Sequence, residues 1–314
     1  MDEAVSRAAA LSVAIMIPAS WLRLVPGCEQ GETPQRIVSL GSGTAHQLWR
    51  VRSRRGDYVL RAPDAAAPRM LTPVFQRECL LQRCAAGLGL APQIMAVSSS
   101  DSVLVMQFID GRQPKPHELG CEPWLEQLLA AVQRLHGAPV PDLPPLNPLA
   151  DAAMFAQQVL AAQPTEAPLI RRRLQWAEAL WREIAADGRA RAVIHCDLHA
   201  GNIIVRGDAA GQLIFLDWEY ANVGDPLLDF AALCAQYPLV QPQVMQFLVG
   251  QAPRPAISAQ RLFAATAVFR LLSWLWWRAR SCQQANVQGS TPEQLQQMVA
   301  LEEQLDQSLE RAQC

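Results

Sequence analysis

Three oxygen-bearing side chains are the first candidates for chemistry in this chain. The stretch VIHCDLHAGNIIV (residues 193–205) carries Asp197 and Asn202 beside an apolar run of strand type, and the later run LIFLD ends at Asp217. The turn-forming GDAAGQ between IIVR and LIFLD predicts an antiparallel hairpin, which should bring Asn202 beside Asp217. A carboxamide and two carboxylates suit a hard cation such as Mg²⁺, with phosphate oxygens completing its coordination.

Two histidines and a cysteine interrupt the same stretch. His195 and His199, with Cys196, invite a zinc site, but such a small set lacks the partners and the spacing that zinc sites have. A histidine between apolar strands is more often a hydrogen-bonded structural residue than a catalyst. We therefore expect no zinc, and we expect His195 to support the loop by bonding its backbone.

The order of these residues resembles a known catalytic pattern. His195-x-Asp197-x4-Asn202 followed by Asp217 is similar to the catalytic loop and the metal-binding aspartate of the protein-kinase-like fold. The wording HCDLHAGNIIV, followed by LDWEYANVGDPLLDFA, looks like the aminoglycoside phosphotransferase and choline kinase superfamily. The resemblance implies a phosphotransferase that uses ATP and Mg²⁺ and has an alcohol group as acceptor.

Position by position, the resemblance implies a role for each residue of the pattern. Asp197 would orient or deprotonate the attacking hydroxyl, and Asn202 and Asp217 would hold Mg²⁺. Glu219 would assist the metal or an acceptor group. Asp229, in the downstream GDPLLD, would brace the catalytic loop. Positioning and charge neutralisation would then supply most of the rate enhancement.

Phosphate binding in such enzymes usually needs a strand lysine paired with a helix glutamate. The only lysine, Lys115, lies in a proline-flanked loop and does not fit this role. Arg61 in DYVLRAP stands at the matching place, and Glu78 in VFQRECLLQR offers the helix partner. Arginine at this position is similar to what choline and thiamine kinases carry, and a guanidinium binds phosphate oxygens in pairs.

Two further segments are candidates for contacts to the nucleotide. GSGTAHQLWRV, with Gly41 and Gly43, resembles a nucleotide-covering loop, because glycine lets backbone amides approach phosphate closely. VMQFIDG (residues 105–111) falls where an adenine-contacting segment is expected, and Gln107 and Ile109 would present backbone groups there.

The elements that must position these residues divide into two regions. From 35 to 108 short β-branched runs predict strands, with one helix inside residues 72–92. After Gly111 helical stripes dominate, over 122–137, 154–162, 170–186 and from 228 onward. We expect an α+β, bilobal protein-kinase-like fold: an N-terminal segment 1–30, a nucleotide-covering lobe 31–108 and a mainly helical lobe 109–314.

Composition and net charge limit the kinds of partner and the cellular location that we expect for this chain. A net charge of -2 over 314 residues argues against a nucleic-acid partner, whose binding needs a positive surface. Eight cysteines without a CxxC pair predict reduced thiols and a cytoplasmic location. The apolar run 8–19 is too short to span a bilayer and follows acidic residues, so we expect neither a signal peptide nor a membrane partner. Met16 is an alternative start.

The motifs shared by the superfamily do not identify the acceptor, so the evidence for it must come from the helical region. FRLLSWLWWRARS (residues 269–281) carries Trp274 and Trp277, which either stack on a cationic ring in an acceptor pocket or pack in the core. VLRAPDAAAP, LHAGN followed by LDWEYA, and this tryptophan-rich helix resemble thiamine kinase and favour thiamine as the small-molecule alcohol. Choline or ethanolamine, and an aminoglycoside or amino sugar, are alternative acceptors. A non-catalytic binding module is the other class, disfavoured because no residue needed for transfer is missing.

Overall fold

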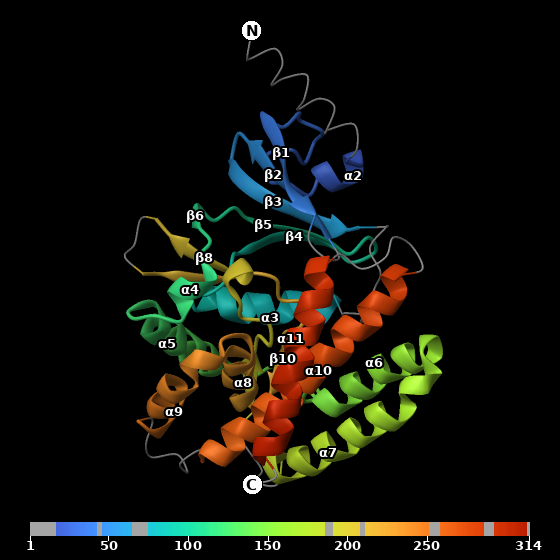
Figure 1. Ribbon diagram of the computed structural model, residues 1–314. Helices are drawn as coiled ribbons and strands as arrows, with labels where there is room; N and C mark the ends of the chain where they lie inside the picture. Colours follow the sequence, from blue (N-terminus) through green and yellow to red (C-terminus); the bar gives the residue numbers. More distant parts are fainter. Residues whose placement is uncertain are drawn as a thin grey trace. The chain divides into compact units, whose positions relative to one another are not determined.

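The computed structural model describes residues 17–42, 46–64, 75–185, 191–207, 211–250, 258–285 and 292–312 (Figure 1). Met16 with the apolar run before it, and Gly43 of the glycine-rich loop, lie outside the described residues. The chain forms two compact units: unit 1 comprises Met1–Arg112 and Ile204–Glu219, and unit 2 comprises Gln113–Ile203 and Tyr220–Cys314. Strands gather in unit 1 and helices dominate unit 2, so the expected α+β class is confirmed.

Unit 1 is built on an antiparallel five-stranded sheet in the order β1-β2-β3-β5-β4. A second sheet of three short strands has the order β6-β8-β9. The elements of this unit are β1 (Arg36–Ser42), β2 (His46–Ser53), β3 (Gly56–Pro63), β4 (Ile94–Ser98), β5 (Val103–Gln107), β6 (Gly111–Arg112), β8 (Ile203–Arg206), β9 (Leu213–Phe215) and the helices α2 (Ala19–Leu22) and α3 (Phe75–Gly87).

Strand β3 shows why this sheet can carry a charged residue in its interior. Successive side chains of a strand point to opposite faces. Leu60 joins the buried cluster that also contains Val51, Val103 and Val105, whereas Arg61 has its side chain on the other face. Register fixes the position of Arg61, which pairs with Leu48 on one side and Leu104 on the other.

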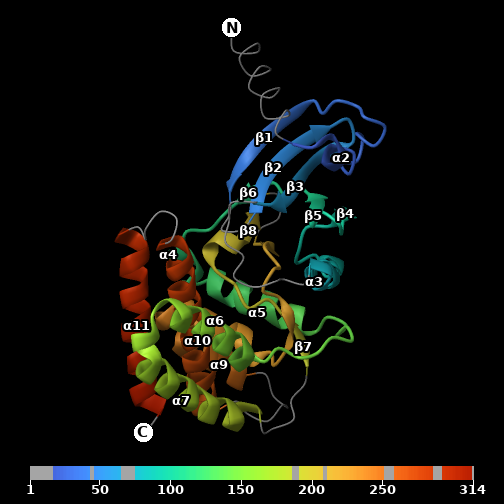
Figure 2. The same ribbon diagram turned by 90° about the vertical axis from the view of Figure 1, so that its right-hand side faces the viewer.

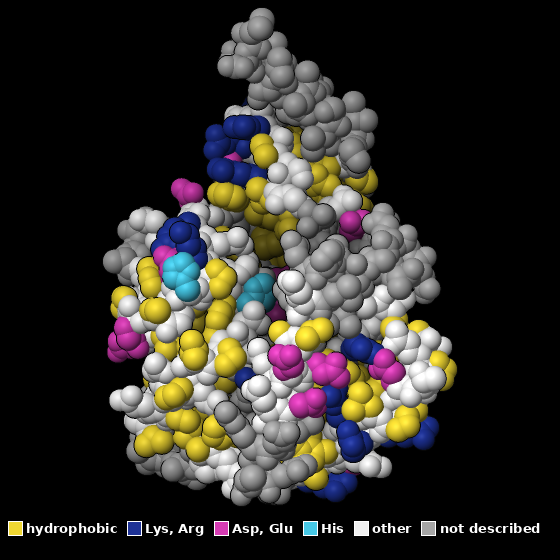
Figure 3. All heavy atoms as spheres, viewed as in Figure 1, with side chains coloured by type: hydrophobic (Ala, Val, Ile, Leu, Met, Phe, Trp, Pro, Cys, Tyr) yellow, Lys and Arg dark blue, Asp and Glu magenta, His cyan; other side chains and the backbone are white. Residues whose placement is uncertain are grey.

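Arginine side chains gather over β1 and β2 on the face seen in Figure 3. Arg36 lies directly opposite Arg52 in the antiparallel register, an arrangement of like charges that is unfavourable by itself. Asp57 of β3 offsets it: its carboxylate accepts hydrogen bonds from Arg52 Nε at 2.7 Å and Nη2 at 2.8 Å, and also from Arg50. These bonds, led by that from Arg52, hold the pKa of Asp57 far below its usual range.

This lowered pKa predicts a pH-dependent stability contribution. A carboxyl group whose pKa is depressed on folding stabilises the protein above the pKa of the unfolded chain, about 3.9, and the contribution is lost as the pH falls towards the folded pKa. We expect Asp57→Asn to unfold at lower urea concentration than the wild type at pH 7. The difference should shrink below about pH 4. A constant difference from pH 7 to pH 3 would contradict this.

Unit 2 is an assembly of helices with one two-stranded sheet. Its helices are α4 (Pro116–Leu119), α5 (Trp124–His136), α6 (Pro148–Ala162), α7 (Ala167–Ala185), α8 (Leu227–Gln236), α9 (Gln241–Val249), α10 (Ala259–Ala285) and α11 (Pro292–Ala312). Three 3-10 turns, η1 (Pro164–Glu166), η2 (Ala200–Asn202) and η3 (Pro238–Val240), and the antiparallel strands β7 (Ala192–Ile194) and β10 (Asn222–Gly224) complete it. None of the helices in the described ranges is long and apolar enough to cross a membrane.

The long helix α10 organises this unit, because α6, α7, α8 and α11 all pack against it (Figure 2). Helix α6 begins earlier than its apolar pattern suggests, at Pro148 instead of near Met154. The reason is local: the Asn147 side chain accepts a hydrogen bond from the Leu149 N–H at 3.1 Å, and proline fits the first helical turn.

Candidate active site

In unit 1 the side chain of Arg61 lies among three carboxylates. Its guanidinium forms an ion pair with Glu78 of α3, as the sequence pattern suggested, and its Nη1 lies 3.4 Å from Asp217 Oδ1. The Arg61 and Glu78 side chains are only 5% and 2% exposed, whereas that of Asp217 is 38% exposed. The buried guanidinium of Arg61 is thus next to a carboxylate, that of Asp217, which solvent can reach.

Electrostatics explain how this buried charge is kept. Burial opposes the guanidinium charge, but Glu78 and then Asp217 and Glu219 outweigh it, so the pKa of Arg61 is raised. Burial also raises the pKa of Glu78, and the ion pair with Arg61 works against that rise. Removing one partner of such a pair costs far more than an exposed pair would, because an uncompensated buried charge remains.

The segment after β9 presents two acidic residues of the predicted site. Asp217 has a φ of +57°, in the left-handed region that non-glycine residues rarely adopt and that tends to occur at functional positions. Glu219 is buried, with its Oε2 3.7 Å from His46 Nδ1 at the start of β2. Trp218 between them is buried, and its Nε1 donates to the Phe215 carbonyl at 3.1 Å. The tryptophan anchors the segment and the two acids flank it.

In unit 2 the carboxylate of Asp229 holds the start of the catalytic loop. Asp229, on α8, is fully buried and accepts hydrogen bonds from the backbone N–H groups of His195 at 3.0 Å and Cys196 at 2.8 Å. His136 Nε2, at the end of α5, lies 2.9 Å from the other carboxylate oxygen. Cys196, one of the two residues whose N–H groups Asp229 binds, has a φ of +64°, in the left-handed region that non-glycine residues rarely adopt.

Asp197 and Asn202 lie together at the other end of this loop. Asn202 Nδ2 donates to the Asp197 carboxylate at 2.8 Å and to the Asp197 carbonyl at 3.0 Å. Both amide hydrogens are directed at Asp197, which turns the amide oxygen of Asn202 away from it. His195 is buried, and its Nδ1 accepts from the Asp197 N–H at 3.3 Å, a contact of the structural kind expected for it.

The donor set fits the cation that the resemblance implies. Mg²⁺ is bound by one or two protein oxygens together with substrate phosphates, and the Asn202 amide oxygen and the accessible Asp217 carboxylate are ligands of that kind. No three His, Cys, Asp or Glu side chains within the described ranges form a group that could hold a metal ion. Asn202 belongs to unit 2 and Asp217 to unit 1, and their juxtaposition stays a prediction.

The remaining nucleotide candidates lie in unit 1. Gly41 has a φ of +102° next to a bulge in the β1–β2 pairing, and a side chain there would meet no atom within 4 Å, so backbone conformation is what favours glycine. The Gln107 N–H donates to the Gln93 carbonyl at 2.9 Å. Gln107 could therefore offer a nucleotide its carbonyl but not its amide. Ile109 is buried beyond the end of β5.

The two tryptophans proposed for the acceptor differ in environment. Trp274 is fully buried, with the guanidinium of Arg173 stacked on its ring at 4.5 Å, which is a core position. Trp277 is half-buried and meets Trp276 edge to face at 4.9 Å. Trp276 Nε1 is hydrogen-bonded to the Tyr220 hydroxyl at 3.0 Å. Exposed aromatic surface in this part of α10 is therefore found at 276 and 277, and not at 274.

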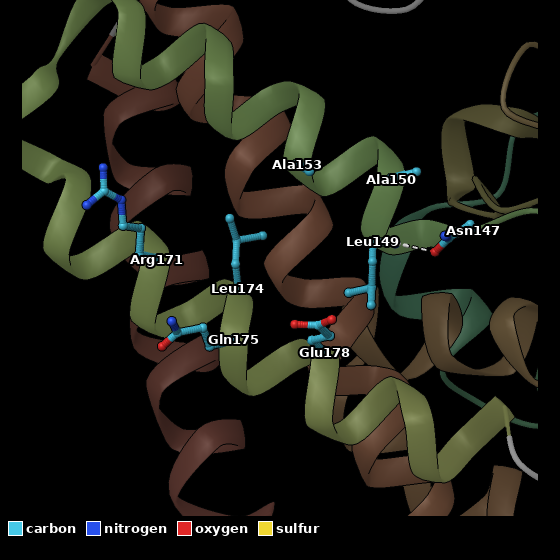
Figure 4. Close-up of a pocket in the computed structure, with 8 residues that line it drawn as sticks. All are labelled: Asn147, Leu149, Ala150, Ala153, Arg171, Leu174, Gln175 and Glu178. Atoms are coloured by element: carbon cyan, nitrogen blue, oxygen red, sulfur yellow. Dashed lines mark hydrogen bonds between the residues drawn. The ribbon is translucent and has the colours of Figure 1, made fainter.

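Unit 2 has a pocket of about 500 Å³. Figure 4 shows it between α6 and α7, with Leu149 and Leu174 facing each other and Arg171 and Glu178 on α7. None of its lining residues belongs to the predicted site, and we assign it no role.

Sequence reasoning missed two residues that support the catalytic loop, His136 indirectly through Asp229 and Tyr237 by a direct hydrogen bond. His136 ends a helix whose pattern predicted only a buried stripe, and Tyr237 follows α8 in an ordinary polar–apolar stretch. The Tyr237 hydroxyl accepts a hydrogen bond from the Ala200 N–H at 3.0 Å, and burial raises the pKa of Tyr237. Neither residue stands at a spacing that marks it, because each meets the loop through the tertiary fold.

Known protein structures share this fold. The chain is similar to a choline/ethanolamine kinase family protein from Mesorhizobium loti, at 22% identity with a TM-score of 0.68 over 94% of this chain and 97% of that one. It is similar to the choline kinase LicA from Streptococcus pneumoniae, at 15% identity with a TM-score of 0.70 over 90% and 96%. A similar arrangement occurs in the aminoglycoside phosphotransferase APH(4)-Ia, at 17% identity and a TM-score of 0.64 over 90% and 97%.

Sequence comparison adds one curated relative and a family. Acyl-CoA dehydrogenase family member 10 of Mus musculus is 22% identical over 223 residues, which are 65% of this chain, and the match spans only 20% of that longer protein. The model of the phosphotransferase enzyme family matches residues 36–256, a range that contains Arg61, Asp197, Asn202 and Asp217. This match covers well over half of the chain, and the chain therefore belongs to the phosphotransferase enzyme family.

Proposed function

We propose that this protein is a kinase that transfers the γ-phosphoryl group of ATP to a hydroxyl of a small cationic alcohol, with thiamine as the first candidate. The observation that carries the proposal is the buried Arg61–Glu78 ion pair whose guanidinium also lies 3.4 Å from the accessible Asp217. A strand cation held by a helix carboxylate, next to a metal-type aspartate, is the equipment that phosphoryl transfer from ATP requires.

The chemistry assigns one task to each group. Asp197 accepts the proton of the acceptor hydroxyl as its oxygen bonds to the γ-phosphorus, while the bond from that phosphorus to the β–γ bridging oxygen breaks and ADP leaves. Asn202 and Asp217 would hold Mg²⁺, which when bound neutralises charge on the phosphate oxygens. Arg61 would bind the phosphates, with Glu78 fixing its orientation.

The same proposal gives the remaining candidate residues roles around the nucleotide and in the catalytic loop. The glycine-rich loop around Gly41 and Gly43 would cover the phosphates, and the Gln107 carbonyl with the Ile109 amide would meet the adenine. His195 and Asp229 would keep the catalytic loop in shape. Glu219 would serve the metal or the acceptor. ATP and reduced thiols are both features of the cytoplasm, where we place the enzyme.

The acceptor is the finer part of the proposal. Trp276 and Trp277 offer half-buried aromatic surface that suits a cationic ring or a quaternary ammonium group. Two of the acids that an amino sugar would use near the end of the chain are engaged otherwise, because Glu302 and Asp306 of α11 are ion-paired with the buried Arg173 at 3.1 and 2.6 Å. This favours thiamine or choline over an aminoglycoside.

Choline or ethanolamine is the second candidate. It is favoured by the fold shared with a choline/ethanolamine kinase family protein and with a choline kinase. The quaternary nitrogen of choline and the thiazolium ring of thiamine present the same charge to an aromatic surface. The aromatic residues therefore do not discriminate between the two acceptors.

An acceptor panel tests the function directly. The full chain is incubated with ATP and Mg²⁺ and, separately, thiamine, choline, ethanolamine, an aminoglycoside and an amino sugar. ADP release and the mass of the phosphorylated product are followed, with Asp197→Ala as the inactive control. We expect phosphorylated thiamine. If another alcohol is phosphorylated and thiamine is not, the proposal of thiamine as acceptor is wrong and the proposal of a kinase stands. If the protein binds the nucleotide but phosphorylates none of the acceptors, the proposal of a kinase is wrong.

A further inference from the structure

The imidazole of His199 connects the two residues of the catalytic loop that the proposed reaction uses. It stands between Asp197 and Asn202 in the chain, at the position preceding the 3-10 turn η2. Its Nδ1 accepts a hydrogen bond from the Gly201 N–H at 3.0 Å, and its Nε2 lies 3.7 Å from Asp197 Oδ2. Its carbonyl accepts from the Asn202 N–H at 2.9 Å.

The contact with Gly201 determines which ring nitrogen carries the proton. The backbone N–H of Gly201 is a donor, so Nδ1 must be the acceptor, and in the neutral ring the hydrogen is then on Nε2. That N–H is on the side of the ring that faces Asp197 Oδ2. At 3.7 Å the pair is beyond hydrogen-bond distance, and the interaction is that of an N–H dipole with a nearby carboxylate.

Gly201 shows that the ring position is built into the loop. A Cβ at residue 201 would lie 2.8 Å from His199 Cε1 and 3.0 Å from His199 Nδ1, closer than real contacts of this kind. Glycine is therefore needed at 201 for the imidazole to occupy its place. The constraint is steric, since the space a side chain would need is filled by the ring.

The same Asp197 oxygen is approached from a second direction. Asn202 Nδ2 lies 2.8 Å from Asp197 Oδ2, the atom that His199 Nε2 also faces. The amide of Asn202 and the imidazole of His199 thus both face one oxygen of the Asp197 carboxylate. His199 also caps the turn that carries Asn202. The His199 ring therefore affects the orientation of both the Asp197 and the Asn202 side chains.

We propose that His199 is a positioning residue for phosphoryl transfer, which caps the η2 turn through Nδ1 and orients the Asp197 carboxylate through Nε2–H. The proposal rests on the function proposed above. It requires no metal ligation by His199. A residue that only stabilised the loop would change the folded population, whereas a positioning residue changes kcat with KM nearly constant.

Asparagine and glutamine separate the two ring nitrogens. Asparagine places an acceptor where Nδ1 is and has nothing at Nε2, whereas glutamine places its amide near the Nε2 position and loses the cap. We expect His199→Ala to lower kcat about 10-fold with KM within about two-fold, and His199→Asn to lower it about 3-fold. His199→Gln is expected to lie near the alanine variant. His117→Ala, an exposed histidine of α4, is the matched control and should leave kcat unchanged.

Hydrogen exchange of the Gly201 amide reports the cap without any turnover. We expect exchange about 3- to 10-fold faster in His199→Ala and His199→Gln than in the wild type, and close to wild type in His199→Asn. Gly201→Ala supplies a steric test. It should lower kcat about as much as His199→Ala, and it should add less than about two-fold in a His199→Ala background, where no ring is left to displace.

The outcomes separate this proposal from the proposed function. If the wild type turns over an acceptor, retention of at least half of the wild-type kcat by His199→Ala overturns the proposal, as does additivity of Gly201→Ala with it. If the wild type phosphorylates none of the acceptors, the proposed kinase function is wrong, and hydrogen exchange of the Gly201 amide is the remaining test of the His199 contact. Faster Gly201 exchange in the alanine variant with protection kept in the asparagine variant then supports the cap through Nδ1 but leaves no phosphoryl transfer for His199 to assist, and equal exchange in all variants overturns the cap as well.

Discussion

Asp197→Asn is expected to lower kcat about 1,000-fold, within the range that removal of a general base produces. Asparagine is nearly isosteric and its side-chain oxygen can still accept from Asn202, which in the wild type donates to Asp197 at 2.8 Å. Asn202 also donates to the Asp197 carbonyl at 3.0 Å, a contact that the substitution leaves in place. The loop should therefore keep its shape while the proton acceptor is lost, and the KM for ATP should change by less than about two-fold.

The control is Asp101→Asn, at an exposed aspartate between β4 and β5 that makes a hydrogen bond with Ser98. It should leave kcat unchanged. Steady-state ADP release with the acceptor identified in the panel gives both parameters, and thermal unfolding checks that each variant is folded. An Asp197→Asn variant that keeps more than about a tenth of the wild-type kcat would exclude Asp197 as the base.

Glu78→Gln is expected to reduce the free energy of unfolding by about 3 kcal/mol, the lower end of the cost of breaking a buried ion pair. Glutamine fills the same space and retains a hydrogen-bond acceptor, so the loss comes mainly from leaving the Arg61 charge uncompensated in a site where its side chain is only 5% exposed. Burial raises the pKa of Glu78 and the ion pair with Arg61 opposes that rise, so the measurement belongs at alkaline pH, which favours the charged carboxylate.

Glu178→Gln is the matched control for this substitution. Glu178 forms an i,i+4 ion pair with Arg182 at 3.0 Å, and the two side chains are 54% and 71% exposed. An exposed helical pair contributes about 0.3 to 0.5 kcal/mol, so the control should unfold almost like the wild type. Urea unfolding followed by circular dichroism compares the two variants. Equal midpoints for Glu78→Gln and Glu178→Gln would show that the buried pair has no special weight.

Residues that act through local pattern could be predicted from the sequence. Short β-branched runs predict the strand that carries Arg61 and helical spacing predicts the helix that carries Glu78, and the two side chains form the ion pair that the resemblance implies. The apolar stripe predicts a start of α6 near Met154, which is too late, because the stripe does not include the first turn that the Asn147 side chain caps.

One polar network could not be predicted from the sequence pattern. Arg173 is buried, stacks on Trp274 and binds Glu302 and Asp306, which lie 129 and 133 positions away. An RRR run reads from the sequence as a solvated helix face, and only packing against α10 and α11 selects one of the three arginines for burial. Glu302 and Asp306 of α11 are thereby engaged with Arg173, which makes them less available to an acceptor.

The sequence by itself indicated the enzyme class: the order of Asp197, Asn202 and Asp217 resembles the phosphotransferase pattern, and the match of the family model confirms the family. This is possible because the pattern is a fixed order of residue types along the chain, whereas the role of each residue stays a prediction. The tertiary structure alone decided that Arg61 meets Asp217, 156 positions along the chain, that Tyr237 binds the catalytic loop from just beyond the end of α8, and that Trp274 is core. Such contacts follow from how whole elements pack, and no periodicity in a single chain records them.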